Sequence, residues 1–109
     1  MKDHRLIDDR SLEFGRAVAA RLAAQPELIA RARATVTRWL TTCSPHVRPA
    51  LQEWLAALNG PTEGVMAVLT GRDERAVRLR QSNPFAGVLS QTERNAILRR
   101  FESYDAATA

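Results

Sequence analysis

Apolar residues recur at three- and four-residue intervals along most of this chain, and this periodicity limits the fold more than any other feature. Such spacing places apolar side chains on one face of an α-helix. No stretch alternates apolar and polar residues over the length of a strand, and no sequence repeat of roughly 20 to 50 residues is visible. The sequence therefore predicts an all-α fold.

Prolines and glycines divide the periodic stretches into separate helices. Proline suits the first turn of a helix, where no backbone N–H is needed, and glycine suits the position after the last turn. The residues expected to open or close helices in this way are Pro26, Pro49, Gly60, Pro61 and Gly71. The predicted helices then cover about residues 9–24, 26–42, 49–58, 61–70, 73–80 and 91–102. We expect a single-domain bundle of five or six short helices.

The 109 residues of the chain leave room for one domain. Residues 1–8 carry little apolar pattern and are expected to form a loose lead. Residues 9–102 are expected to form the helical domain, and residues 103–109 a frayed tail.

Two short sequences have the spacing of a capping box, in which a Ser or Thr and an acidic residue three positions later accept each other's backbone N–H groups. They begin at Thr70 and at Ser90, and their acidic partners are Asp73 and Glu93. We therefore expect a helix to start at each of the two places.

The chain is basic, with a formal net charge of +4 and a pI near 10.5, and all 16 of its basic residues except Lys2 are arginines. Such a charge favours acidic partners, either nucleic acid or an acidic protein. The alternative is a solvated surface on which the arginines pair with the 12 acidic residues.

No apolar run approaches the roughly 18 residues that a membrane helix needs, and the amino end does not resemble a secretion signal. The single cysteine, Cys43, excludes an internal disulfide and fits a reducing compartment. We therefore expect a cytoplasmic protein that does not enter the membrane.

Cys43 and His46 have the spacing of a metal or catalytic pair, but the chain offers little to complete such a site. A structural zinc site needs four ligands, and the other histidine, His4, is remote in sequence. A nucleophilic cysteine needs a third group that orients its base, and none is recognisable. The scattered glycines also form no phosphate-binding loop. We expect a protein without metal or cofactor that is not an enzyme.

Residues 61–81 have the length of a helix-turn-helix, which suggests a DNA-binding transcriptional regulator as one hypothesis. The arginines that would reach the duplex are Arg72, Arg75, Arg78 and Arg80. Asp73 and Glu74 would stand at the start of the recognition helix and face the phosphates, which weakens this interpretation.

A second hypothesis is a protein-interaction module. Pro84, Phe85, Val88 and Leu89 form an apolar cluster in a predicted loop, next to the basic helix that carries Arg75 and Arg78. Protein interfaces combine apolar anchors with steering charge in this way. The alternative, which we favour for the apolar cluster itself, is that these side chains plug the bundle. The predicted partner-binding residues are Arg75, Arg78, Pro84, Phe85 and Leu89.

Residues 78–98, which read RLRQSNPFAGVLSQTERNAIL, resemble the carboxy-terminal segment of short Arg-rich bacterial antitoxins from toxin–antitoxin gene pairs. The matching positions are Arg78, Pro84, Phe85, Gly87 and Leu89. This resemblance implies a partner toxin that the protein binds and neutralises by occlusion. Many antitoxins join a DNA-binding domain to a disordered tail, whereas the helical pattern fills nearly all of this chain. The two tryptophans and the short helices also allow a homodimer.

Overall fold

The chain folds into six α-helices and one 3₁₀ turn over the residues that the computed structural model describes. These are residues 2–108 for the backbone, and residues 8–85 and 87–101 for the side chains. The elements are α1 (Lys2–Ala24), α2 (Leu28–Leu40), α3 (Arg48–Asn59), α4 (Thr62–Thr70), α5 (Glu74–Arg80), the 3₁₀ turn η1 (Ala86–Val88) and α6 (Gln91–Thr108). No strand occurs between residues 2 and 108, so the predicted all-α bundle of five or six helices is confirmed.

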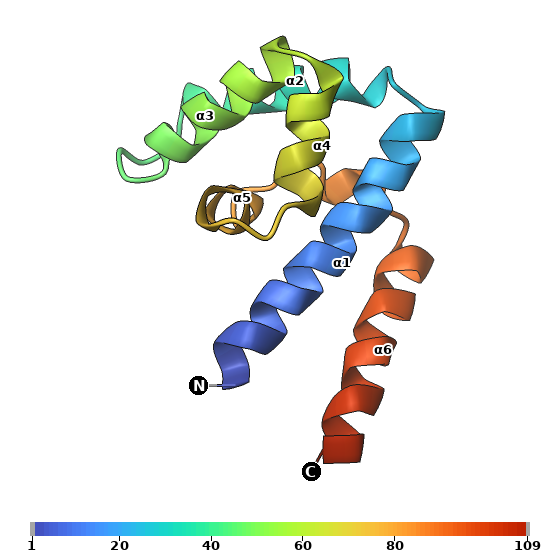
Figure 1. Cartoon of the computed structure of the whole chain (residues 1–109). Coiled ribbons are helices and arrows are strands. Elements are labelled where there is room, and N and C mark those ends of the chain that lie inside the picture. Colours follow the sequence, from blue (N-terminus) through green and yellow to red (C-terminus); the bar gives the residue numbers. More distant parts are fainter. Residues whose placement is uncertain (1, 109) are drawn as a thin grey trace.

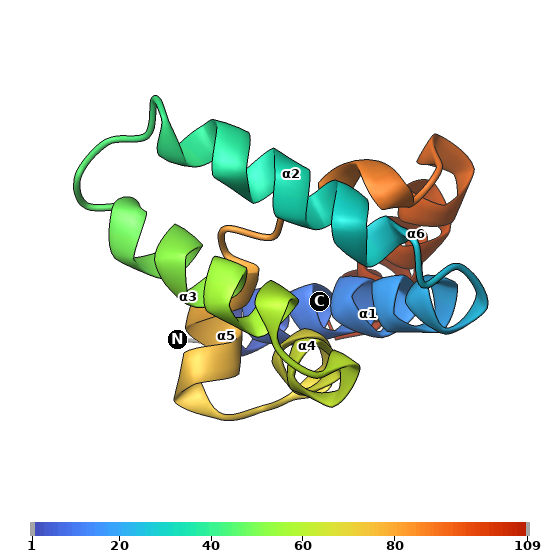
Figure 2. The ribbon, with the colours of Figure 1, turned by 90° about the horizontal axis from the view of Figure 1, so that it is seen from above.

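The helices pack as two antiparallel pairs joined by two shorter helices. α1 and α6 lie side by side and run in opposite directions (Figure 1). α2 and α3 form the second pair, and Figure 2 shows the long connection between them at the far end from α1. α4 and α5 each contact both α1 and α3, so they join the two pairs. No helix in the described part of the chain combines the length and the apolar character needed to cross a membrane.

The predicted helix boundaries are close to the observed ones in the middle of the chain and wrong at its ends. α1 already begins at residue 2 and α6 continues to residue 108. The lead expected over residues 1–8 and the tail expected over residues 103–109 are therefore helical wherever the structure describes them, and residues 1 and 109 lie outside the described residues. Neither segment contains a proline or glycine that would interrupt a helix.

One of the two predicted capping boxes is confirmed. At the start of α6 the N–H of Glu93 donates to the hydroxyl of Ser90 at 3.1 Å, and the N–H of Ser90 donates to the Glu93 carboxylate at 2.8 Å. At the start of α5, by contrast, the carboxylate of Asp73 is itself the cap and accepts from the N–H of Ala76 at 3.3 Å. The box predicted at Thr70 is wrong because Thr70 is still the last residue of α4.

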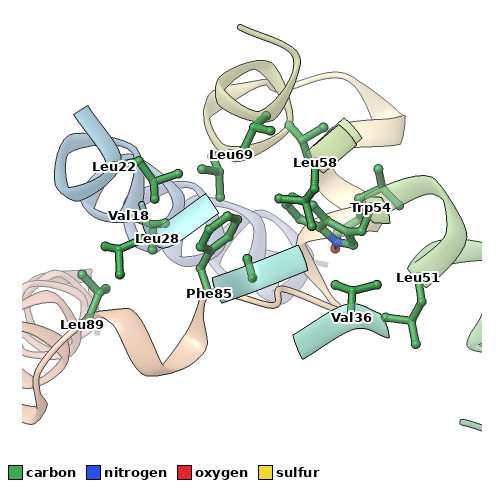
Figure 3. Packing of buried hydrophobic residues seen from close by; sticks show 14 of the residues in the cluster. Val18, Leu22, Leu28, Val36, Leu51, Trp54, Leu58, Leu69, Phe85 and Leu89 are labelled. Atoms are coloured by element: carbon green, nitrogen blue, oxygen red, sulfur yellow. The ribbon is translucent and has the colours of Figure 1, made fainter. Parts of the chain in front are cut away.

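Phe85 lies at the centre of the core, although it belongs to the irregular segment between α5 and α6. Its side chain is fully buried, and its ring meets the indole of Trp54 edge to face, with 6.0 Å between the ring centroids. Figure 3 shows it between Val18 and Leu22 on one side and Trp54 on the other. Burying a phenylalanine stabilises a fold by roughly 1.5–3 kcal/mol. The interpretation in which this segment plugs the bundle is confirmed.

α1 and α4 approach each other so closely at Gly15 that a larger residue does not fit. A β-carbon added to Gly15 would lie 1.9 Å from the carbonyl oxygen of Leu69, far inside the contact distance of real atoms. Glycine at this position therefore sets the distance between the two helices, and the buried Leu69 fixes the inner face of α4.

Arg80 is a charged residue that the core buries, with 6% of its surface exposed. Its guanidinium donates to the backbone carbonyls of Val68 and Gly71 at 2.8 and 2.7 Å, and to the hydroxyl of Ser11 at 3.0 Å. Carbonyls at a helix C-terminus have no partner within the helix and favour a cation. Arg80 thus caps α4 from α5 and ties both helices to α1.

Candidate protein-binding groove

The predicted partner-binding residues do not form one surface. Pro84, Phe85 and Leu89 are buried, whereas Arg75 and Arg78 lie exposed on α5. The core buries the side chains of all three apolar residues, and Pro84 and Phe85 also contribute to a wall of the groove described below. Helical periodicity could not decide this, since the segment that carries them lies outside the long helices.

Arg75 and Arg78 both bind the carboxylate of Glu53 on α3. Arg78 donates to its two oxygens at 2.8 and 3.2 Å, and Arg75 donates at 3.3 Å. The hydrogen bond from Arg78 is the main cause that lowers the pKa of Glu53 below its ordinary value, and the same bond raises the pKa of Arg78. The positive charge of this face is therefore partly neutralised within the protein.

Two helices, α4 and α5, occupy the segment predicted as a helix-turn-helix, but the arginines assigned to it lie in different surroundings. Arg80 is buried against α4, so the prediction that it contacts DNA is wrong. Burial lowers the pKa of Arg80 below its ordinary value. Arg75 and Arg78 share Glu53, and Arg72 is exposed.

A groove with a volume of about 390 Å³ runs between α2 and the segment that precedes α6. One wall is a single face of α2, because residues 28, 31, 32, 35, 38 and 39 follow helical spacing. The opposite wall is the turn that contains η1, where Gly87 is exposed and Val88 is half-buried. The turn is held in place by the buried Pro84 and Phe85 below it, and by the carboxamide oxygen of Asn83, which accepts from the N–H of Phe85 at 2.8 Å.

Three arginines line this groove, and none of its described lining residues is acidic. Arg21 is bound to Glu93 and reaches the carbonyl of Val88 at 3.5 Å, so it holds the end of α1 against the turn. The pKa of Glu93 is lowered by the backbone hydrogen bond from Ser90 and then by Arg21. Within the groove, Arg21 is therefore already neutralised by a carboxylate.

Arg31 and Arg38 differ from Arg21 in having no acidic partner. Both are exposed, and neither forms an ion pair with any side chain that the structure describes. The ion pair that helical spacing suggests between Arg31 and Glu27 is not formed, although Glu27 lies one turn away and is also exposed. Two guanidinium groups thus line the groove without a hydrogen-bond partner among the side chains that the structure describes.

A second hollow adjoins the groove at Trp39, which lines both. Its volume is about 360 Å³, and it lies where α2 ends and the connection to α3 begins. The half-buried side chains of Cys43 and Val47 and the buried Leu51 form its apolar part, with three hydroxyl groups beside them. No charged residue is among its described lining residues, in contrast to the groove.

Cys43 and His46 are not joined by a hydrogen bond between their described side chains. The thiol of Cys43 faces the carbonyl of Leu40 at 4.0 Å, and His46 is exposed. No cluster of three or more His, Cys, Asp and Glu side chains suited to a metal occurs among the described residues.

Arg31, Arg38 and Trp39 were not predicted as site residues. Their spacing of seven and eight residues along one helix was the available signal, because it places them on the same side of α2. This spacing does not predict the opposite wall of the groove, which belongs to a turn some 50 residues further along the chain. In comparisons with protein-family models, curated proteins and solved structures, nothing matches this chain.

Proposed function

We propose that this protein is a non-enzymatic interaction module that binds an acidic partner protein through the groove between α2 and the 84–88 turn. The observation that carries the proposal is the pair Arg31 and Arg38, two exposed guanidinium groups with no acidic side chain beside them in the groove. Carboxylates are the ligands that guanidinium groups bind most strongly in protein interfaces.

The apolar surface of the groove supports a protein partner rather than a free anion. Trp39 and Val88 are half-buried and stand on opposite walls. Tryptophan and arginine are enriched among the residues that dominate binding energies in protein interfaces. A phosphate or other small anion would use the arginines but would leave this apolar surface exposed.

The resemblance of residues 78–98 to antitoxins leads to a narrower proposal, in which the partner is a toxin and binding occludes it. The groove is compatible with this role because the 84–88 turn, which lies inside that segment, forms one of its walls. The turn would then act through its position and through Val88 rather than through the buried Phe85.

DNA binding by α4 and α5 has weaker support. Of the arginines assigned to it, Arg75 and Arg78 share one carboxylate and Arg80 is enclosed, which leaves Arg72. α5 has only seven residues, and Glu74 lies in its first turn. Negative charge at this position opposes the approach of phosphates.

The proposal is tested by comparative affinity capture from nuclease-treated and untreated lysates of the native host. Three immobilised proteins are compared: the unaltered chain, the double variant Arg31→Glu/Arg38→Glu, and the control Arg48→Glu/Arg99→Glu. The control reverses two arginines that are also exposed and unpaired among the described side chains, but that lie outside the groove.

We expect one stoichiometric protein on the unaltered chain and on the control, and its loss from the groove variant. The two variants carry the same change in net charge, so a difference between them reports position rather than total charge. Equal retention by both variants would contradict the proposal. Recovery of nucleic acid without protein from untreated lysate would favour the DNA-binding alternative.

A further inference from the structure

We infer that the partner segment combines acidic side chains with one large apolar side chain, and that this apolar side chain enters the hollow formed by Trp39, Cys43, Val47 and Leu51. The inference rests on the proposed function, since it describes what the groove binds. It adds a second subsite and a chemical pattern that the arginines alone do not imply.

The two subsites are neighbours because Trp39 belongs to both. Trp39 lines the groove together with Arg38, and it lines the hollow together with Thr42 and Cys43. A segment that lies along α2 and contacts Arg31 and Arg38 therefore reaches the hollow as it continues past Trp39. The two volumes, about 390 and 360 Å³, are similar, so the hollow is as large a feature of this surface as the groove itself.

The two subsites differ in the chemistry that they offer. The groove has three arginines and no described acidic residue, whereas the hollow has no charged residue among those described. An acidic side chain in the hollow would lose water without gaining a cation, which is costly. An apolar side chain there would cover the exposed parts of Trp39 and Val47, and burial of apolar surface favours binding.

The spacing along α2 sets how far apart the partner's groups must be. Arg38 lies in the last turn of α2, which ends at Leu40, and Cys43 follows in the connection to α3. At the rise of a helix, the five residues from Arg38 to Cys43 would span about 7.5 Å. A partner segment spans this distance in two to three residues if it is extended, at roughly 3.3 Å per residue. If it is helical, it needs about five residues. The inferred pattern is therefore one or two acidic residues followed or preceded at this distance by Leu, Ile, Met, Phe or Trp.

The inference is tested by selecting binders from a displayed library of random 12-residue peptides on the folded full chain. We expect the selected peptides to combine acidic residues with one large apolar residue at a fixed spacing. In the best of them, replacing the apolar residue with Ala should weaken binding by about tenfold or more. Replacing the acidic residues with Gln should weaken it by a similar factor.

The position of the apolar side chain is tested by alkylating Cys43, the single cysteine of the chain, with N-ethylmaleimide. The adduct adds a ring at the wall of the hollow. Alkylation should therefore weaken binding of the peptide that carries the apolar residue, and it should leave the affinity of the Ala version unchanged. The same reagent on the variant Cys43→Ser serves as a control, and circular dichroism checks that the fold is retained.

The outcomes separate this inference from the proposed function. If acidic peptides are selected and depend on Arg31 and Arg38, but carry no apolar residue or are insensitive to the adduct, the inference is wrong and the groove stands. If the selected peptides bind the Arg31→Glu/Arg38→Glu variant equally well, both fail. A 12-base-pair DNA duplex that competes with the peptides and depends on the same two arginines would also overturn the inference.

Discussion

The indole N–H of Trp54 donates a hydrogen bond to the backbone carbonyl of Leu79, 2.6 Å away, and so joins the centre of α3 to the end of α5. Both side chains are fully buried. The same carbonyl also accepts from the N–H of Ser82 at 3.0 Å, which begins the turn that carries Phe85 into the core. One buried tryptophan therefore fixes the place where the chain leaves α5.

Replacing Trp54 with Phe keeps an aromatic ring in the core and removes this hydrogen bond. We expect a loss of about 1–3 kcal/mol in the free energy of unfolding, because the bond disappears and the smaller ring leaves space. Trp54→Ala should cost about 3–5 kcal/mol. Urea denaturation followed by circular dichroism measures both. A Trp54→Phe variant as stable as the unaltered chain would contradict the role given to this bond.

Gly15→Ala should destabilise the protein, because the added methyl group would overlap the carbonyl oxygen of Leu69 and push α1 away from α4. Overpacking of this kind costs about 1–3 kcal/mol or more. Gly64→Ala is the matched control, since a β-carbon on Gly64 meets nothing within 4 Å and its position on α4 is exposed. Alanine is the better helix former by about 1 kcal/mol, so the control should gain stability. Thermal unfolding that shows both variants shifting in the same direction would count against the close approach.

Arg80→Met should destabilise the fold although methionine fits apolar surroundings better than arginine. The carbonyls of Val68 and Gly71 would lose their donor, and a buried acceptor without a partner costs about 1–3 kcal/mol. Arg80→Lys should recover part of the loss, because an ammonium group can reach some but not all of the three acceptors. Chemical denaturation should rank the unaltered chain as the most stable, then Arg80→Lys, then Arg80→Met. Equal stability of Arg80→Met and the unaltered chain would show that the cap is unimportant.

Stability should fall as the solution is acidified below about pH 5. The pKa values of Glu53 and Glu93 are lowered in the folded protein from their ordinary value of 4.5, by hydrogen bonds from Arg78 and from the Ser90 backbone respectively. A carboxyl group whose pKa is lower in the folded state stabilises that state above its unfolded pKa, and this contribution is lost as the pH falls through the folded pKa. Both carboxylates are at the surface, so each effect should be small and reduced by salt. Glu53→Gln and Glu93→Gln should each reduce the change in the denaturation midpoint between pH 6 and about pH 3. A pH profile that neither substitution changes would contradict these assignments.

The helices that proline and glycine delimit, and the cap at Ser90, could be predicted from the sequence. These features depend on residues close together in the chain, where spacing and backbone chemistry decide the outcome. The burial of Arg80 and the position of Phe85 could not be predicted, because they depend on which helices become neighbours. An arginine on a short helix is expected at the surface, and only the approach of the α4 C-terminus gives it buried acceptors.

The groove was beyond prediction for the same physical reason. The spacing of Arg31 and Arg38 shows that they share a face of α2, but the wall opposite them belongs to residues 84–88. Glu27 lies one helical turn from Arg31, but the two side chains form no ion pair. On α5, by contrast, the exposed Arg75 and Arg78 both bind a single carboxylate from α3, Glu53.

The central claim is that Arg31 and Arg38 bind acidic groups of a partner protein. The most direct measurement is the dissociation constant of the purified partner for the unaltered chain and for Arg31→Glu/Arg38→Glu, determined by calorimetry at one salt concentration. We predict that the double reversal weakens binding by about tenfold or more, while Arg48→Glu/Arg99→Glu changes it by less than about threefold. Equal dissociation constants for the unaltered chain and the groove variant would contradict the claim.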